Sequence, residues 1–353
     1  MMEYLQQLSE AIGISGREEA VRKIVLEAID GCVDEVHVDA LGSITAIKRG
    51  TEGSKRPKVM VDAHMDEVGF MATGVDGDGL IKFVPVGGID ARIVPGMRVK
   101  VGPSGIQGVV LSTPIHKNKD STVIQIANMR IDIGASNKEE ANGKVKKGDR
   151  IAFDSRYRIL NDSTICGKSL DDRAGCSVLI DVLRESSYPC DILAAFTVQE
   201  EIGLRGAMVA ARRLKPDVGL ALECTTAGDI PNPLADPDSD DLADLNPTCR
   251  VGRGPTLSFM DRSMIADPRL LRHLRQLADV YGVPYQLKTQ LGGGTDAGSI
   301  HRANTGVPSA VISLPGRYIH SPHALISHSD YLNAVRLAQA FLENLTHDVL
   351  KPL

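Results

Sequence analysis

Apolar residues follow two different patterns along this chain of 353 residues, and the borders between the patterns constrain the fold more than any other feature. In residues 1–68 and 166–353, stretches with helical spacing of apolar residues alternate with short, mostly apolar runs. Between residues 69 and 165, short runs rich in Val and Ile follow one another and are separated by Gly and Pro. We therefore expect one architecture to be inserted into another.

The outer segments predict helices that alternate with strands. Residues 36–47 have the pattern of a hairpin that turns at Gly42, and residues 58–63 predict a short buried strand. Further helices are expected at 18–29, 174–184, 204–214, 268–281, after Gly294 and at 331–350, and further strands at 192–198, 218–223, 285–289 and 309–314. Because strands separated by helices usually run parallel, we predict an α/β fold with a mixed, mostly parallel sheet and helices on both faces.

The inner segment predicts a small β-barrel with one brief helix near residues 137–141. A chain of this length usually forms about two domains. We therefore predict one domain from residues 1–68 and 166–353 and an inserted β domain from residues 69–165. The insert carries none of the clustered ionisable groups described below, so we expect it to make a subunit interface.

Composition excludes several classes of function. The formal net charge is −5, which provides no basic field for nucleic acid or an anionic membrane surface. Residues 1–31 predict an amphipathic helix without the pattern of a signal peptide, and no apolar run is long enough to span a membrane. The six cysteines are scattered without CxxC spacing and are expected to be reduced. We therefore expect a cytoplasmic protein.

Polar clusters follow the apolar strands at the ends where sites form in open α/β sheets. They are His64 with Asp66 and Glu67, Asp171 with Asp172 at the start of a helix, Glu200 with Glu201, Glu223, and His320. So many ionisable groups at one edge of a sheet repel each other unless cations compensate their charge. The pattern therefore predicts a metal site.

The residue types indicate which metals would bind. Imidazole with carboxylate and no thiolate suits Zn²⁺, Co²⁺ or Mn²⁺ better than Mg²⁺ or Ca²⁺. Two His and at least three carboxylates exceed the needs of one tetrahedral ion, whereas two ions about 3.5–4 Å apart would use them all. Cys224 is a weaker candidate, because it directly follows Glu223 on a strand and would point elsewhere.

The adjacent carboxylates Glu200 and Glu201 indicate a hydrolase. Neighbours on a regular strand face opposite sides, but here the strand is ending and Gly203 follows. One carboxylate can therefore bind metal while the other accepts a proton from water and delivers it to a leaving amine.

Six strings, in order over essentially the whole chain, resemble the tetrahedral dinuclear-metal aminopeptidases, which include glutamyl and deblocking aminopeptidases and some proteins once labelled cellulases. The strings are AHMDEVGF, KSLDDRAG, QEEIGLRGA, ALECTTAGDIP, GGGTDAG and GRYIHSPH. The resemblance implies an aminopeptidase that acts on short peptides with two Zn²⁺ or Co²⁺ ions. It also implies a dimer formed through the insert, six of which assemble into a dodecamer.

The resemblance further implies a role for each matching residue. Glu200 would be the general base, and Asp66 would assist by holding the ring of His64. The implied metal ligands are His64, Asp171 as the bridge, Glu201, Glu223 and His320. Asp296, Gly293 and Gly294 would line the substrate cleft. Many members carry Asp at the position of Glu223, which leaves the preferred metal open, and His323 is a less favoured alternative to His320.

Three other functions are kept as alternatives. A two-metal N-acyl amino-acid deacylase or carboxypeptidase would use the same metals on another substrate. A glycosidase would need two carboxylates around a sugar and usually aromatic platforms, but the chain has no Trp. A non-catalytic binding or assembly protein would not need Glu200. The acidic residues 236–244 predict either a solvated loop or a rim that favours basic substrates.

Overall fold

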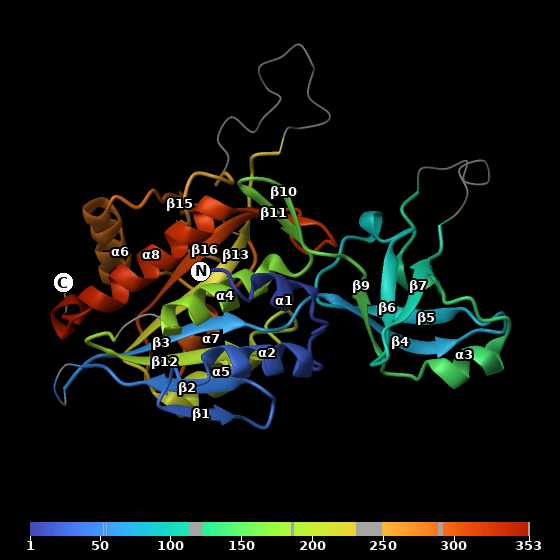
Figure 1. Ribbon diagram of the computed structural model, residues 1–353, viewed down its shortest axis with the longest axis horizontal. Coiled ribbons are helices and arrows are strands. Elements are labelled where there is room, and N and C mark those ends of the chain that lie inside the picture. The colour runs from blue at the N-terminus through green and yellow to red at the C-terminus, as the bar shows by residue number, and fades with distance from the viewer. Residues whose placement is uncertain are drawn as a thin grey trace, which may run out of the picture.

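The computed structural model describes residues 1–51, 53, 55–112, 122–184, 187–230, 249–288 and 292–351. Within these residues, one mixed sheet organises the larger part of the molecule (Figure 1). Its strands, in spatial order, are β1 (Glu35–Val38), β2 (Ile44–Lys48), β12 (Asp191–Thr197), β3 (Lys58–His64), β13 (Val218–Thr226), β16 (Ser309–Arg317), β17 (Ala324–Ser327), β11 (Thr164–Gly167) and β10 (Arg158–Asn161). The four central strands β12, β3, β13 and β16 run parallel.

Helices cover both faces of this sheet. Strand β3 illustrates the alternation, since Val59 and Val61 face one apolar core while Met60 faces another. The first core contains side chains of α1 (Leu5–Glu10), α2 (Glu19–Ile29), α4 (Leu170–Arg184), α6 (Pro268–Tyr281) and α8 (His328–Asn344). The second core lies under α5 (Arg205–Leu214) and α7 (Ala297–Ile300).

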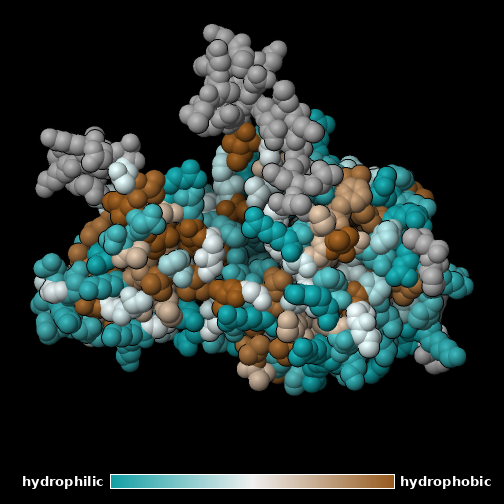
Figure 2. Space-filling view, turned by 180° about the vertical axis from the view of Figure 1, so that it is seen from behind, coloured by the Kyte–Doolittle hydropathy of each residue, from teal (hydrophilic) through white to brown (hydrophobic). Residues whose placement is uncertain are grey.

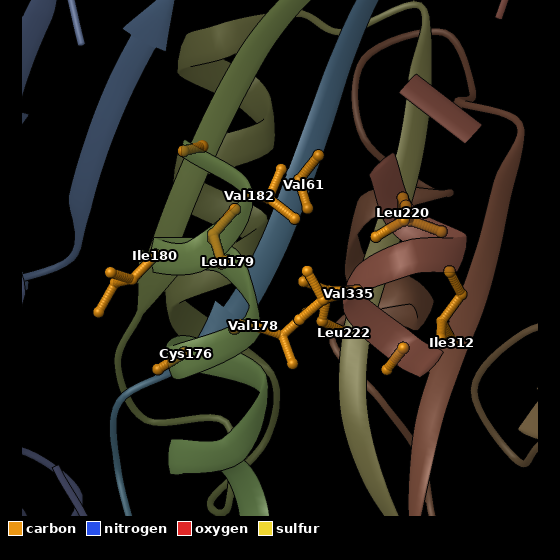
Figure 3. Packing of buried hydrophobic residues seen from close by; sticks show 14 of the residues in the cluster. Val61, Cys176, Val178, Leu179, Ile180, Val182, Leu220, Leu222, Ile312 and Val335 are labelled. Carbon is orange, nitrogen blue, oxygen red and sulfur yellow. The ribbon is translucent and has the colours of Figure 1, made fainter. Parts of the chain in front are cut away.

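The first core shows why helix α4 lies where it does. Val178 and Val182 of this helix lie against strands β3 and β13, near Val61 and Leu222 (Figure 3). Each fully buried aliphatic side chain of this kind contributes roughly 1.5–3 kcal/mol. This packing anchors the helix whose first turn carries Asp171 and Asp172.

The inserted segment forms a closed barrel beside the large sheet (Figure 1). Its strands are β4 (Gly69–Val75), β5 (Ile81–Val86), β6 (Arg98–Val101), β7 (Ile106–Val110), β8 (Ile131–Asp132) and β9 (Arg150–Phe153). Phe70 packs edge-on against Phe83 and Phe153 in its core. Helix α3 (Lys138–Lys144) lies outside the barrel, and 3₁₀ turns occur at Ala91–Ile93, Ile126–Asn128 and, near the end of the chain, His347–Leu350. The predicted α/β fold with an inserted barrel is confirmed.

The structure differs from the sequence prediction in several elements. Strands β10 and β11 follow the barrel but join the large sheet, because β11 pairs with β17. Strand β14 (Thr256–Ser258), which was not predicted, pairs with β15 (Gln286–Lys288) and β16.

The first 31 residues form two helices instead of one. Gly16 has a φ of +80°, and the buried guanidinium of Arg173 donates hydrogen bonds to the carbonyl oxygens of Leu8 and Ala11 at the end of α1.

No helix in the described part of the chain is both long and apolar enough to cross a membrane. The acidic residues 236–244 lie outside the described residues, so both interpretations of that segment stay predictions.

Candidate metal centre

The polar clusters that follow β3, β12, β13 and β16 converge at one edge of the sheet. His64 is the last residue of β3, Glu200 and Glu201 follow β12, and Glu223 lies near the end of β13. Parallel strands place their carboxyl ends side by side, which brings these residues together although they are far apart in sequence. The first turn of α4 brings Asp171 to the same place.

Asp171 lies between the two imidazoles. Its Oδ1 is 3.4 Å from Nε2 of His64, and its Oδ2 is 3.4 Å from Nε2 of His320. Oε1 of Glu201 is 3.3 Å from Nε2 of His320. On the other side, Nε2 of His64 is 3.8 Å from Oε2 of Glu223 and 3.9 Å from Oε2 of Glu200. One carboxylate is therefore shared between two clusters of donors.

The donor atoms fit two metal ions. Ligand atoms of His64, Asp171 and Glu223 lie within 4.8 Å of one another, and so do those of Asp171, Glu201 and His320. A third group with the same spacing is formed by His64, Glu200 and Glu201. Asp171 belongs to the first two groups, which is the arrangement expected of a bridging ligand in a two-metal site.

Both imidazoles have the orientation of metal ligands. Nδ1 of His320 lies 2.8 Å from the carbonyl oxygen of Gly88 and therefore donates its proton there. Nδ1 of His64 lies 3.2 Å from the carbonyl oxygen of Asp66 and 3.4 Å from its Oδ1. When Nδ1 donates to oxygen, Nε2 keeps its lone pair for a metal. In both residues this Nε2 faces Asp171.

The crowded carboxylates of the cluster also favour the binding of cations. Burial, together with neighbouring carboxylates, raises the pKa of Glu200 and Glu223 well above the ordinary value and that of Glu201 to about 7. Burial also raises the pKa of Asp171, but hydrogen bonds from His320 and His64 outweigh burial and lower this pKa. Within the described residues, the ion-pair partners of these carboxylates are the two imidazoles. Divalent ions would relieve the repulsion that remains.

Asp66 makes more hydrogen bonds within the site than the sequence predicts. Its carboxylate accepts hydrogen bonds from the backbone N–H of Glu200 at 2.9 Å and of Glu201 at 3.2 Å. It also accepts one from the hydroxyl of Ser15 at 2.6 Å. Asp66 therefore orients the turn that carries both glutamates, in addition to the ring of His64. The segment with Ser15 contributes to the site although nothing in its local sequence indicates this.

Asp296 occupies a different place from the predicted cleft lining. It is fully buried, its backbone N–H donates to Oε1 of Glu223 at 3.2 Å, and its Oδ2 accepts from the hydroxyl of Thr197 at 2.6 Å. Asp296 therefore holds the carboxylate of Glu223 in place through this hydrogen bond. Next to it lies Asp62, a buried carboxyl that sequence reasoning missed, whose pKa is raised by burial and by Asp296. The sequence feature that could have indicated Asp62 is a single acidic residue within an otherwise mostly apolar strand.

The two rival ligands are not part of the cluster. Nδ1 of His323 lies 3.5 Å from the hydroxyl of Ser155 and belongs to none of the three donor groups. The thiol of Cys224 donates to the carbonyl oxygen of Leu170 at 3.0 Å, and burial raises its pKa. The thiol is therefore held in its neutral form, which binds metals poorly.

A cavity of about 680 Å³ opens onto the candidate metal ligands. Gly293 and Gly294 line this cavity, and so do Thr225, Ser258 and Lys288. On one face the molecule is hollowed between the barrel and the large sheet, and hydrophilic residues surround the hollow (Figure 2). The site thus combines metal donors, a neighbouring carboxylate and room for a ligand.

Known proteins are similar to this chain in sequence and in fold. A family model described as M42 glutamyl aminopeptidase matches residues 42–337. A putative aminopeptidase of Acetivibrio thermocellus is 40% identical over 340 residues, covering 96% of this chain and 97% of the relative. A lysyl aminopeptidase of Pyrococcus furiosus is 33% identical over 356 residues, covering 97% of each chain. The TET1 peptidase of Pyrococcus horikoshii, described as able to assemble into a tetrahedron or a large octahedral shell, matches with a TM-score of 0.83 and 31% identity over 98% of this chain and 99% of that one.

Proposed function

The chain belongs to the M42 glutamyl aminopeptidase family, and we propose that it is a metal-dependent exopeptidase that removes residues from the N-termini of short peptides. The observation that carries this proposal is the pair of donor groups that share Asp171. The relatives act as a guide to the reaction but not to the substrate, since one of them is named a lysyl aminopeptidase and the family is named for glutamyl residues.

We assign the metal ligands from the two donor groups. His64 and Glu223 would hold one ion, Glu201 and His320 the other, and Asp171 both. Imidazole and carboxylate donors favour Zn²⁺ or Co²⁺. When bound, such a pair of ions polarises a carbonyl group and lowers the pKa of a water molecule.

We assign the general base to Glu200. Its carboxylate adjoins His64 but belongs to neither group that contains Asp171, so it is the glutamate left free by the proposed coordination. Burial raises its pKa, which suits a group that accepts a proton from water and later releases it to the leaving amine. Asp66 holds the N–H groups of Glu200 and Glu201 and so keeps base and ligand in separate positions.

The alternative functions are less well supported. A glycosidase does not need two imidazoles around a shared carboxylate. A deacylase or carboxypeptidase would use the same donors, but the matching family and the relatives named above are aminopeptidases. The intact cluster of Glu200 and the metal donors argues against a purely structural protein.

The first prediction tests the proposed function directly. The purified protein should bind about two Zn²⁺ or Co²⁺ ions per chain and hydrolyse aminoacyl anilides. Chelation should abolish this activity because the donors alone cannot activate water, and added Co²⁺ or Zn²⁺ should restore it. Elemental analysis and the anilide assay measure both effects, with soluble cellulose and N-acyl amino acids as control substrates. Full activity after exhaustive chelation, or cleavage of only the control substrates, would refute the proposal.

We also propose that the barrel within residues 69–165, without strands β10 and β11, is the part of the chain that joins subunits, and that dimers assemble into a dodecamer. Two observations support an interface on the barrel. Val109, Leu111 and Val123 are 44%, 40% and 44% exposed. Hydrophobic residues also gather on the barrel surface at the left of Figure 2. Apolar side chains that are clustered on a surface often mark contacts between proteins.

The second prediction concerns this interface. Light scattering at micromolar concentration should give a particle much larger than one chain. Val109→Lys should shift it toward smaller species because a buried charge without a partner opposes association. Val280→Lys is the matched control, since Val280 is 78% exposed on helix α6, outside the insert. A monomeric wild-type protein would contradict the proposal, as would equal effects of the two substitutions.

A cytoplasmic location is a further proposal. It is supported by the six cysteines, all of which are thiols, because disulfides are typical of oxidising compartments. The net charge of −5 supports the expectation that nucleic acid and anionic membranes are not partners.

A further inference from the structure

Three charged side chains are buried beside the proposed metal centre. Nζ of Lys168 donates hydrogen bonds to both carboxylate oxygens of Glu67, at 2.7 and 2.8 Å. Nη2 of Arg173 lies 3.5 Å from Oε1 of Glu67. The exposed fraction of these side chains is 3% for Glu67 and Lys168 and 0% for Arg173. We call Glu67, Lys168 and Arg173 the buried ion triad.

The buried ion triad connects two segments that carry proposed metal ligands. Glu67 follows β3, three residues after His64. The two cations flank Asp171 in sequence, with Lys168 before it and Arg173 after it. The ion pairs of Glu67 therefore join the end of β3 to the first turn of α4. They span the same two segments as the contact of 3.4 Å between His64 and Asp171.

The segment that follows α1 surrounds the buried ion triad. Helix α1 lies beside α4 (Figure 1). Nζ of Lys168 donates a hydrogen bond to the carbonyl oxygen of Ala11 at 2.9 Å, and Oε1 of Glu67 accepts one from the backbone N–H of Gly13 at 3.0 Å. The hydroxyl of Ser9 donates to the carbonyl oxygen of Lys168 at 2.8 Å. The polar atoms of the triad are thus held by the backbone as well as by each other.

A small cavity lies between the buried ion triad and one of the donor groups. Its volume is about 10 Å³, which leaves room for at most about one water molecule. Its lining includes Glu67 and Lys168 on one side and Asp171, Glu201 and His320 on the other. A displacement of the triad would therefore reach these donors directly, because so little solvent lies between them.

The buried ion triad is unfavourable for stability alone. Burial lowers the pKa of Lys168 to about 8, although the charge of Glu67 opposes this shift. Charges that leave water lose hydration that their mutual attraction only partly replaces. Apolar side chains of similar volume often stabilise a fold as well or better. The position of the triad beside the proposed metal ligands gives the buried charges a role that apolar side chains would not fill.

We propose that the buried ion triad positions the metal ligands: it holds the first turn of α4 against the end of β3, so that Asp171 faces His64 and His320 before the ions bind. The inference rests on the proposed metal-dependent function and adds positioning residues to it. Among the described residues, the members of the triad belong to none of the donor groups, so they act through the ligands. In the metal-free protein the crowded carboxylates repel each other, and the triad would oppose their displacement.

The test removes the ion pair between Lys168 and Glu67 without changing the net charge. In the double variant Lys168→Met with Glu67→Gln, an amide oxygen at position 67 can still accept the hydrogen bond of Gly13. Arg173 keeps its hydrogen bonds to backbone carbonyl oxygens near the end of α1. Substituting both partners leaves neither of them as an unpaired buried charge, which a single substitution would do. The chelated double variant should therefore fold, as thermal unfolding can show.

The double variant should bind metal more weakly than the wild-type protein. Residues that orient a ligand without touching the metal typically contribute about 10- to 100-fold to metal affinity, and we expect a loss of this size in calorimetric titration with Zn²⁺. The visible absorption spectrum of the Co²⁺-loaded protein should also change, because it depends on the geometry of the ligands. A residue that only stabilises the fold would alter neither property in a folded protein.

Arg269→Met is the matched control. Arg269 and Asp267 form a partly buried ion pair at the start of α6. The backbone N–H of Asp267 donates to the carbonyl oxygen of Ser309, the first residue of β16, whereas the proposed ligands lie at the opposite ends of the parallel strands. This substitution should lower the temperature of thermal unfolding but leave the Zn²⁺ affinity and the Co²⁺ spectrum unchanged.

Two results would overturn the inference and leave the metal-dependent function standing. One is a folded double variant whose Zn²⁺ affinity stays within about threefold of the wild-type value and whose Co²⁺ spectrum is unchanged. The other is an equal loss of affinity in Arg269→Met. If the wild-type protein itself binds no metal ion, the proposed function falls, and the inference falls with it.

Ser9→Ala decides the question if the double variant does not fold. This substitution removes only a hydroxyl group, and with it the hydrogen bond to the carbonyl oxygen of Lys168. The loss of one such bond should lower the Zn²⁺ affinity by about 2- to 10-fold if the segment around Lys168 positions Asp171. An affinity equal to that of the wild-type protein would then overturn the inference.

Discussion

Replacing Glu200 with Gln should lower turnover by roughly 100-fold or more while the protein keeps about two bound ions. The substitution preserves the shape of the side chain but removes its ability to accept a proton. Asp66 holds the backbone N–H groups of residues 200 and 201, and this contact does not depend on the side chain of Glu200. The fold and the ligand positions should therefore survive. Anilide turnover and metal content, measured on the same preparation, test both halves of the expectation.

Glu201→Gln is the matched control for this substitution. Oε1 of Glu201 lies 3.3 Å from Nε2 of His320, and Glu201 shares a donor group with Asp171. Its loss should weaken one metal site, so that excess metal restores part of the activity. Loss of metal in Glu200→Gln together with full metal in Glu201→Gln would reverse the two roles. Normal turnover in both variants would refute the proposed mechanism.

Asp171→Asn should remove both metal ions and reduce turnover at least as strongly. Asp171 is the residue that the two donor groups share, with Oδ1 facing His64 and Oδ2 facing His320. Loss of an outer residue that only supports a ligand typically lowers metal affinity or activity by about 10- to 100-fold, so loss of the shared ligand should exceed this. Calorimetric titration with Zn²⁺ and elemental analysis measure the binding.

Glu223→Gln is the comparison that isolates the bridging role. Glu223 belongs to one donor group, so this variant should lose one ion and retain the other at His320, Glu201 and Asp171. Thermal unfolding of the chelated proteins shows whether either variant is simply misfolded. Equal metal content in Asp171→Asn and Glu223→Gln would argue against Asp171 as the bridge.

The residues that hold the proposed ligands in place were harder to predict than the ligands themselves. The sequence placed Asp66 beside His64, two residues away, but not beside the N–H groups of Glu200 and Glu201. It placed Asp296 at the cleft, whereas the structure buries this residue behind Glu223. A residue at a strand end can be assigned to an edge of the sheet from its position alone. Whether it faces the cavity or a neighbouring side chain depends on loops whose course no local pattern specifies.

Sequence alone determined the α/β periodicity, the inserted β segment and the set of ionisable residues at the strand ends. These features follow from spacing within single elements and from the rule that parallel strands end at one edge. Tertiary structure decided which groups touch. The carbonyl of Gly88, in the segment after β5, orients His320 from 232 residues away, and Thr225 of β13 meets Lys288 of β15 across the cavity. Strand β11 joins the large sheet through β17 although it follows the barrel in sequence. Such contacts arise from packing between distant segments, and the free energy that selects them comes from burial and pairing that a single element does not contain.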